Sequence, residues 1–382
     1  MSRQKSKDNH TKLRDFLRSG TLQPEERLPG ERELALALGV GRTALRPALE
    51  ELEAQGFLRR QPQSGTFLVA VPPPLMSGTR VTLVAPFQGA GGTGQAAEAG
   101  WLYRVTSAFE RTMRAAGVEL ILMDQSPHSG DPCSVKDMAH RAVAVGAQAA
   151  VFLHPLGTRE KIACALSILH DHEVHPVIVS ARTYPGLASQ VYFDSGWGAY
   201  LATRHLLTRG HRRIGFAGAS VGHEWVRERL AGYRQALAAS EIAGDEAWVW
   251  LPDEGERLPR RDDGASAFER WRALPESARP TALVAANDVV ALGLLDAARA
   301  GGVAVPGALS VIGFDNDPEA LLAGLTTIER PTETLGEAVA QTALERLAAG
   351  PQAATVTLRL RPVLTERATV GPPQSRDDER RQ

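Results

Sequence analysis

The 382-residue sequence predicts two units of different fold class, a mostly helical N-terminal unit and a larger α/β unit. One hydrophobic core rarely serves a chain of this length, so more than one compact unit is expected. The stretch VPPPLMSGT separates the units, because three successive prolines followed by Ser and Gly continue neither a helix nor a central strand. The predicted organisation is a domain at 1–71, a linker at 72–79, a domain at 80–370 and a disordered tail at 371–382.

The composition predicts a soluble cytoplasmic protein with no membrane partner. No apolar run reaches the ~18 residues of a membrane span, and the start MSRQKSKDNH lacks the apolar core of a signal peptide. The two cysteines, Cys133 and Cys164, fit a reducing compartment rather than a disulfide scaffold. The net charge of -1 excludes a uniformly basic surface, but residues 1–70 hold 12 Lys and Arg against 9 Asp and Glu.

The N-terminal unit reads as three helices and a hairpin. TKLRDFLRSG, LPGERELALALG and the stretch GVGRTALRPALEELEAQG at 39–56 have helical periodicity, and FLRRQPQSGTFLV follows as a strand pair with Ser64 and Gly65 at its tip. Two helices joined by a Gly-containing turn and followed by such a hairpin form a winged helix-turn-helix.

The third predicted helix has an apolar and a basic face. At 3.6 residues per turn its leucines share one side, while Arg42, Thr43 and Arg46 fall on another. A guanidinium can grip O6 and N7 of guanine in bidentate fashion, and a helix N-terminus favours a phosphate. This pattern predicts a helix that reads the major groove of DNA.

Residues 11–71 resemble the DNA-binding domain of the GntR family, through RLPGERELALALGVGRTALRPALEELEAQGFLRRQPQSGTFL. The resemblance implies DNA contacts from Arg32, Arg42, Arg46 and the wing residue Gly65, with Thr43 and Ser64 beside them. Two residues depart from the family pattern. Gly41 stands where serine is usual, which removes a helix-capping hydroxyl, and Pro47 lies inside the helix, where we expect a bend or local loosening.

The region from residue 80 onward alternates apolar bursts with helix-length segments. Such alternation over some 290 residues predicts parallel sheets covered by helices, and the length favours two lobes with a cleft between them. The predicted strands are RVTLVAPF, VELILMD, AAVFLHP, HPVIVSA, RIGFAGA, TALVAAND and LSVIGFDN.

Two motifs in this region suggest other functions. GAGGTG at 89–94 satisfies G-x-G-x-x-G, the pattern of a dinucleotide-binding loop in an oxidoreductase, but Asp124 lies 30 residues after Gly94 rather than about 20. HDHEVH at 170–175 could be a metal cluster, but no second group of ligands has a matching spacing. We expect a loop at the first motif, a solvated turn at the second, and no cofactor or enzymatic activity.

Polar residues follow several predicted strands, at the edge where open α/β sheets bind ligands. Arg182, Asn287 and Asp315 lie there, and Arg229 follows another strand. Together with an indole such as Trp101, they can bind the hydroxyls and cover the apolar face of a small polyhydroxylated ligand. Purely structural roles are the alternative: helix capping for Asn287, a turn before Pro318 for Asp315, interlobe salt bridges for the arginines and packing for Trp101.

Residues 80 to about 366 resemble the effector domain of LacI-family regulators, which shares its fold with periplasmic sugar-binding proteins. The motifs are YLATRHLLTRGHRRIGFAGA, RERLAGYRQAL, PTALVAANDVVALGLLDAARAGGVAVPGALSVIGFDN and LTTIERPTETLG. The resemblance implies effector contacts from Trp101, Arg182, Arg229, Asn287 and Asp315. Ala181 replaces a common aspartate, so the identity of the sugar does not transfer.

The combined architecture resembles arabinose-type regulators. It implies a homodimeric repressor that binds an operator and is released by a small sugar; a purine or other metabolite is the alternative effector. VPPPLMSGT replaces the hinge helix usual in LacI-type regulators, so coupling would act through dimer geometry.

Overall fold

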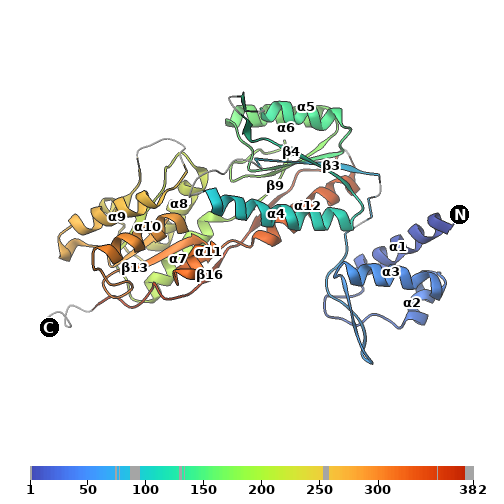
Figure 1. Cartoon of the computed structure of the whole chain (residues 1–382), viewed down its shortest axis with the longest axis horizontal. Helices are drawn as coiled ribbons and strands as arrows, with labels where there is room; N and C mark the ends of the chain where they lie inside the picture. Colours follow the sequence, from blue (N-terminus) through green and yellow to red (C-terminus); the bar gives the residue numbers. More distant parts are fainter. Residues whose placement is uncertain are drawn as a thin grey trace.

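The computed structural model describes residues 2–73, 75–76, 78–86, 95–128, 131–132, 134–252, 258–350 and 352–374. A small helical domain at the N-terminus is followed by two α/β lobes (Figure 1). Both units predicted from the sequence are therefore present.

The N-terminal domain is a three-helix unit with a two-stranded wing. Its elements are α1 (Ser2–Arg18), α2 (Glu31–Leu38), α3 (Arg42–Ala54), β1 (Leu58–Gln61) and β2 (Gly65–Leu68). The strands pair antiparallel, with Leu58 opposite Leu68. Helix α2 ends at Gly39, whose left-handed φ of 63° suits a glycine at this turn. The core is almost entirely leucine, including Leu13, Leu34, Leu45, Leu49 and Leu52.

The linker is bonded to the domains on both sides. Arg14, only 1% exposed, donates from Nη1 to the carbonyl of Pro73 at 3.1 Å and from Nη2 to Gln55 at 2.8 Å. The backbone N–H of Met76 donates to the carbonyl of Ala116 at 2.6 Å, at the end of the first long helix of the α/β domain. The linker therefore contacts the packed parts of both domains.

The first lobe is a six-stranded parallel sheet in the order β15-β9-β8-β7-β3-β4. Its strands are β3 (Arg80–Ala85), β4 (Glu119–Asp124), β7 (Ala149–Leu153), β8 (His175–Val179), β9 (Ser189–Phe193) and β15 (Thr357–Leu360). The helices are α4 (Gln95–Ala115), α5 (Val135–Ala144), α6 (Arg159–Asp171) and α12 (Thr332–Ala349), beside a short pair β5 (Pro127–His128) and β6 (Asp131–Pro132).

The second lobe holds a sheet in the order β11-β10-β12-β13-β14-β16, parallel except for β16. Its strands are β10 (Ile214–Ala217), β11 (Val249–Trp250), β12 (Ala282–Ala285), β13 (Ser310–Asp315), β14 (Thr326–Glu329) and β16 (Val363–Thr365). Its helices are α7 (Ser195–Thr208), α8 (Glu224–Ala238), α9 (Arg261–Ala273), α10 (Asp288–Ala300) and α11 (Pro318–Leu322), with 3₁₀ turns at Glu246–Trp248 and Glu276–Ala278.

The chain crosses between the lobes three times, each time from the carboxyl end of a strand. Strand β9 leads into α7, β14 leads into α12, and β15 leads into β16. The polar residues that follow strands in the two sheets are thereby brought to the junction of the lobes, the place predicted for the ligand.

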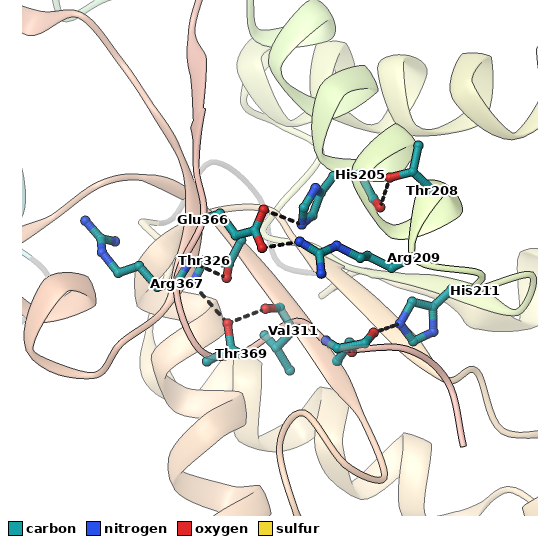
Figure 2. A network of polar contacts seen from close by, with 11 residues as sticks. His205, Thr208, Arg209, His211, Val311, Thr326, Glu366, Arg367 and Thr369 are labelled. Carbon is teal, nitrogen blue, oxygen red and sulfur yellow. Dashed lines mark hydrogen bonds and ion pairs between the residues drawn. The ribbon is translucent and has the colours of Figure 1, made fainter. Parts of the chain in front are cut away.

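The last described segment is bonded to the second lobe (Figure 2). Thr369 donates from Oγ1 to the carbonyl of Val311 at 2.7 Å and accepts from the N–H of Thr326 at 2.9 Å. The carbonyl of Gly371 lies 2.8 Å from Nε2 of the buried His211. The packed region therefore includes Gly371, which the sequence analysis assigned to the tail.

Candidate functional site

The N-terminal half of α3 presents the basic face that the sequence predicts. Leu45, Ala48, Leu49 and Leu52 are buried in the domain core. Because these residues fix the rotation of the helix, Arg42, Thr43 and Arg46 are exposed on its other side. Arg32 on α2 is exposed as well.

Gly41 and Pro47, the two residues that depart from the GntR pattern, both lie at or within α3. Gly41 is the N-cap residue and provides no side-chain hydrogen bond. Helix α3 nevertheless runs from Arg42 to Ala54 as one element, with the exposed Pro47 inside it. The helix is therefore not interrupted at the proline, although Pro47 offers no N–H to the preceding turn.

Glu31 at the start of α2 pairs with both arginines of α3. Its Oε2 lies 3.2 Å from Nε of Arg46 and 3.5 Å from Nε of Arg42. Partial burial opposes ionisation of Glu31, but the hydrogen bonds and charges of Arg46 and Arg42 outweigh it and lower its pKa. The two guanidinium groups are thus held together while their side chains stay more than half exposed, at 61% and 54%.

The wing tip depends on a glycine at position 65. Gly65 has a φ of +113°, and a Cβ there would come within 2.7 Å of Nε of Arg27. Ser64 beside it is exposed. The tip therefore presents a small, accessible turn next to the side chain of Arg27.

At the junction of the lobes, Arg330 contacts residues of both. It follows β14 of the second lobe, where its Nε lies 3.0 Å from Oδ1 of Asp315. Its guanidinium carbon is 5.7 Å from the ring centre of Trp101 and 5.5 Å from that of Phe193, both in the first lobe. Arg330 was not predicted from the sequence, although it stands directly after the strand in the motif LTTIERPTETLG.

Arg229 and Asp315 form a buried pair in the second lobe. Nη2 of Arg229 donates to Oδ1 of Asp315 at 3.1 Å, Nη1 donates to the carbonyl of Ala286, and the guanidinium carbon lies 3.5 Å from the ring centre of Phe314. Burial lowers the pKa of Arg229 to about 10, so it stays charged at neutral pH, and Asp315 opposes the shift. Arg229 lies in the second turn of α8.

Asp315 has an uncommon backbone conformation, with a φ of +124°. Non-glycine residues rarely adopt such values, and strained positions cluster at ligand sites. Its carboxylate lies between Arg229 and Arg330, at 3.1 and 3.0 Å. Its side chain is 11% exposed, which leaves little of the carboxylate open to water.

Asn287 and its neighbour Asp288 have structural contacts. Oδ1 of Asn287 accepts from the N–H of Val290 at 3.0 Å and so caps α10, which was the alternative role considered for it. Asp288 is fully buried and accepts from Thr327 at 2.6 Å and from the N–H of Asp317 at 2.9 Å.

The first lobe contributes Trp101, Arg182 and a histidine that the sequence analysis missed. The rings of Trp101 and His154 meet edge to face, with centres 6.5 Å apart. His154 is exposed by surface area but is surrounded by protein on several sides. The resulting desolvation lowers its pKa, and the charges of His223, Arg330 and Arg182 add to this. Nη1 of Arg182 donates to the carbonyl of Gly157 at 3.3 Å. The backbone after β8 therefore brings Arg182 to the same region as His154.

The geometry bears on one of the two alternative motifs. The GAGGTG loop at 89–94 lies outside the described residues. Within the described part of the chain, no group of three or more His, Cys, Asp or Glu is placed to hold a metal, and in HDHEVH the Nδ1 atom of His172 lies 2.8 Å from the carbonyl of Ile168. None of the described helices is long and apolar enough to span a membrane.

Family models match the N-terminal domain and the later part of the α/β domain. Residues 9–68 match "Bacterial regulatory proteins, gntR family", and residues 203–370 match "Periplasmic binding protein-like domain". The chain therefore joins a helix-turn-helix domain of the gntR family to a periplasmic binding protein-like domain, as the resemblance predicted.

The relatives of the α/β domain are transcription regulators. HTH-type transcriptional repressor PurR of Klebsiella pneumoniae (strain 342) is 31% identical over 209 residues, which are 54% of this chain and 59% of that protein. HTH-type transcriptional regulator GalS of Salmonella typhimurium is 35% identical over 201 residues, or 52% of this chain and 57% of that protein. The matches thus span less than two thirds of the relatives' length.

Solved structures share the fold. A LacI family transcriptional regulator from Enterococcus faecium with bound ribose aligns with a TM-score of 0.60 at 20% identity, over 78% of this chain and all of that one. A transcriptional regulator CelR–cellobiose complex aligns with a TM-score of 0.60 at 22% identity, over 90% of this chain and all of that one. The predicted two-lobed α/β fold is confirmed.

Proposed function

We propose that this protein is a transcriptional repressor that binds operator DNA through α3 and the wing and is released by a small sugar bound between the lobes. The observation that carries the proposal is the combination of a gntR-family domain with a two-lobed domain whose polar residues meet at the junction. DNA recognition and effector binding are thus assigned to different domains of one chain.

The DNA contacts would come from Arg42, Thr43 and Arg46 in the major groove, with Arg32, Ser64 and Gly65 around them. Bidentate contacts to guanine are each worth about 1–3 kcal/mol of discrimination. The ion pairs with Glu31 are partly exposed, and such pairs contribute about 0–1 kcal/mol, so exchanging Glu31 for a base edge costs little. Glu31 would keep the guanidinium groups extended in the free protein.

The effector contacts would come from Trp101, Arg182, Arg229, Asn287 and Asp315, joined by Arg330 and His154. Carboxylate, amide and guanidinium groups can bind neighbouring hydroxyls, and an indole can cover the apolar face of a sugar ring. The ribose and cellobiose in two solved structures of the same fold support this class. A purine or another non-sugar metabolite is the alternative effector.

Control of DNA binding would require two chains. A homodimer can place two copies of α3 about one duplex turn apart on a palindromic operator. An effector that draws the lobes together would rotate the first lobes, and with them the linker and DNA-binding domains. An allosteric coupling of this kind is typically worth ~1–3 kcal/mol.

The DNA-binding assignment is tested by replacing Arg42 and Arg46 with alanine together. Loss of two base contacts of about 1–3 kcal/mol each predicts at least a ~30-fold weaker affinity for a fragment of its own promoter. The control is Arg111→Ala, which removes an exposed arginine from α4 instead. Unchanged affinity and selectivity in the double variant would contradict the proposal.

The effector assignment is tested by titrating the operator complex with ribose, arabinose, galactose and cellobiose, alongside hypoxanthine, guanine and NAD. Release by a sugar, abolished by Asp315→Asn, is the expected result. Release by a purine alone would replace the sugar with the alternative effector. Saturable binding of NAD, abolished by Gly91→Val, would instead favour the oxidoreductase that the 89–94 loop suggests.

A further inference from the structure

The first lobe contains a cavity at the amino ends of its strands, on the opposite edge from the lobe junction. Its volume is about 330 Å³, within the size range of small-molecule pockets. The walls come from the end of α6, the starts of β8 and β9, and the segment between α12 and β15. The lining side chains that matter chemically are His170, Glu173, His175, Ser189 and Arg346.

This cavity is separate from the proposed effector site. Arg330 immediately precedes α12, and Arg346 lies in the last turn of the same helix. A rise of 1.5 Å per residue places Arg346 about 21 Å from the helix start at Thr332. A small ligand at one site therefore does not reach the other.

Arg346 is the main charged group of the cavity. Its Nη1 donates to the carbonyl of Ala354 at 2.8 Å, which holds the guanidinium in place. Its Nε is buried and has no hydrogen-bond partner in the described structure. A buried guanidinium donor without an acceptor is costly, and an anion in the cavity could relieve that cost by repositioning the side chain.

The other polar side chains of the cavity indicate which groups a ligand would carry besides its negative charge. Burial lowers the pKa of His175 and the Arg346 charge adds to this, so the side chain offers a neutral imidazole at pH 7. Ser189 contributes a buried hydroxyl, and Glu173 is an exposed carboxylate at the rim. Arg346 suits a negative group, whereas Glu173 and Ser189 suit hydroxyl groups. Val174 and Leu187 supply apolar wall.

We propose that this cavity is a second ligand site, which binds a small hydroxylated anion with Arg346 on its negative group and Glu173 on a hydroxyl. The negative group can be a phosphate ester or a carboxylate. The site goes beyond the proposed function, because it lies outside the lobe junction and needs no DNA. It also gives a role to HDHEVH, whose His170, Glu173 and His175 line the cavity without forming a metal site.

The test is calorimetric titration of the full chain with glycerol 3-phosphate, glycerate and neutral glycerol at constant ionic strength. We expect one of the two anions to bind with a Kd below about 1 mM and glycerol not to bind. The two anions distinguish phosphate from carboxylate. Binding of glycerol with equal affinity would overturn the anion assignment, and no saturable binding of either anion would overturn the site.

Four variants locate the binding. Arg346→Gln removes the charge, and Ala354→Phe fills the cavity while keeping the carbonyl that Arg346 bonds. Both should weaken binding at least tenfold. Arg111→Gln removes an exposed charge on the same lobe, and Asp315→Asn alters the effector site, so both should bind like the wild type. Equal affinity in all four variants would refute the location. If Arg346→Gln fails to fold, Ala354→Phe decides.

Discussion

The stability of the second lobe should depend on pH in part through Asp317, and Asp317→Asn should reduce that dependence. Asp317 is 6% exposed and precedes α11. Burial, followed by the charges of Asp315 and Asp288, raises its pKa from 3.8 to about 7. An aspartate whose pKa is raised on folding binds its proton more tightly in the folded state. Its stabilising effect is therefore complete below pH 3.8 and is lost as the pH rises toward 7.

The size of the effect follows from the two pKa values. A difference from 3.8 to about 7, at 1.36 kcal/mol for each pH unit, corresponds to about 4 kcal/mol across the whole window. Between pH 5 and pH 7 this group alone should lower the free energy of unfolding by about 2 kcal/mol. Asparagine has a similar shape and no charge to bury, so Asp317→Asn should make this part of the profile shallower by about that amount and be more stable than the wild type at pH 8.

The measurement is urea unfolding of both proteins at pH 5, 6, 7 and 8, with the second-lobe transition followed by tryptophan fluorescence. The exposed Asp262 on α9 provides the control, because Asp262→Asn should leave the wild-type pH slope unchanged. A slope in Asp317→Asn equal to that of the wild type, with unchanged m-values, would refute the reasoning. It would mean that Asp317 is ionised in the folded protein without penalty.

Three further substitutions test other parts of the structure. Gly65→Ala should destabilise the N-terminal domain by about 1–3 kcal/mol in urea unfolding, because of the φ of +113° and the contact with Arg27; stability equal to the wild type would contradict this. Arg330→Gln should increase the radius of gyration in X-ray scattering, since it removes the guanidinium contacts with the first lobe; an unchanged radius would show that they do not hold the lobes together. Trp101→Phe should change stability by less than about 1 kcal/mol, because the buried indole N–H has no acceptor in the described structure, yet weaken effector binding at least threefold; a larger stability loss would indicate that the indole N–H is satisfied in solution.

The sequence predicts the parts of the fold that depend on local pattern. The leucine stripe of α3 fixes which residues are exposed, so Arg42 and Arg46 could be placed from periodicity alone. The seven predicted strands are all present, because each is an apolar run of Val, Ile, Leu and Ala. Polar residues after these strands could then be assigned to one edge of the sheet.

Strands β9, β14 and β15 escaped the sequence analysis for a physical reason. Their sequences SQVYF, TTIE and TLRL are short and rich in polar residues. Thr326 and Thr327 of β14 are nevertheless fully buried, because partners elsewhere in the chain bond to them: Thr327 donates to Asp288 at 2.6 Å. Because the burial of Thr327 depends on a carboxylate distant in the sequence, the local pattern of hydrophobic residues cannot predict it.

The same limit explains why Arg330 was missed. Its role depends on Trp101 and Phe193, which lie more than a hundred residues earlier and in the other lobe. A guanidinium between two aromatic rings and a carboxylate is recognisable only once both sheets are in place. Arg229 could be found because a family motif contains it, whereas no local feature marks a residue that bridges two lobes.

The contacts around Arg330 also provide a continuous route to the DNA-binding domain. Helix α12 begins two residues later and packs closely on α4, where a Cβ on Gly336 would lie 2.3 Å from the carbonyl of Val105. Because the two backbones touch, α12 cannot slide without moving α4. The carbonyl of Ala116, just beyond α4, accepts from the linker at Met76. If this route couples the two sites, adding effector should change operator affinity less in Arg330→Gln than in the wild type, and an equal change in both proteins would refute the route.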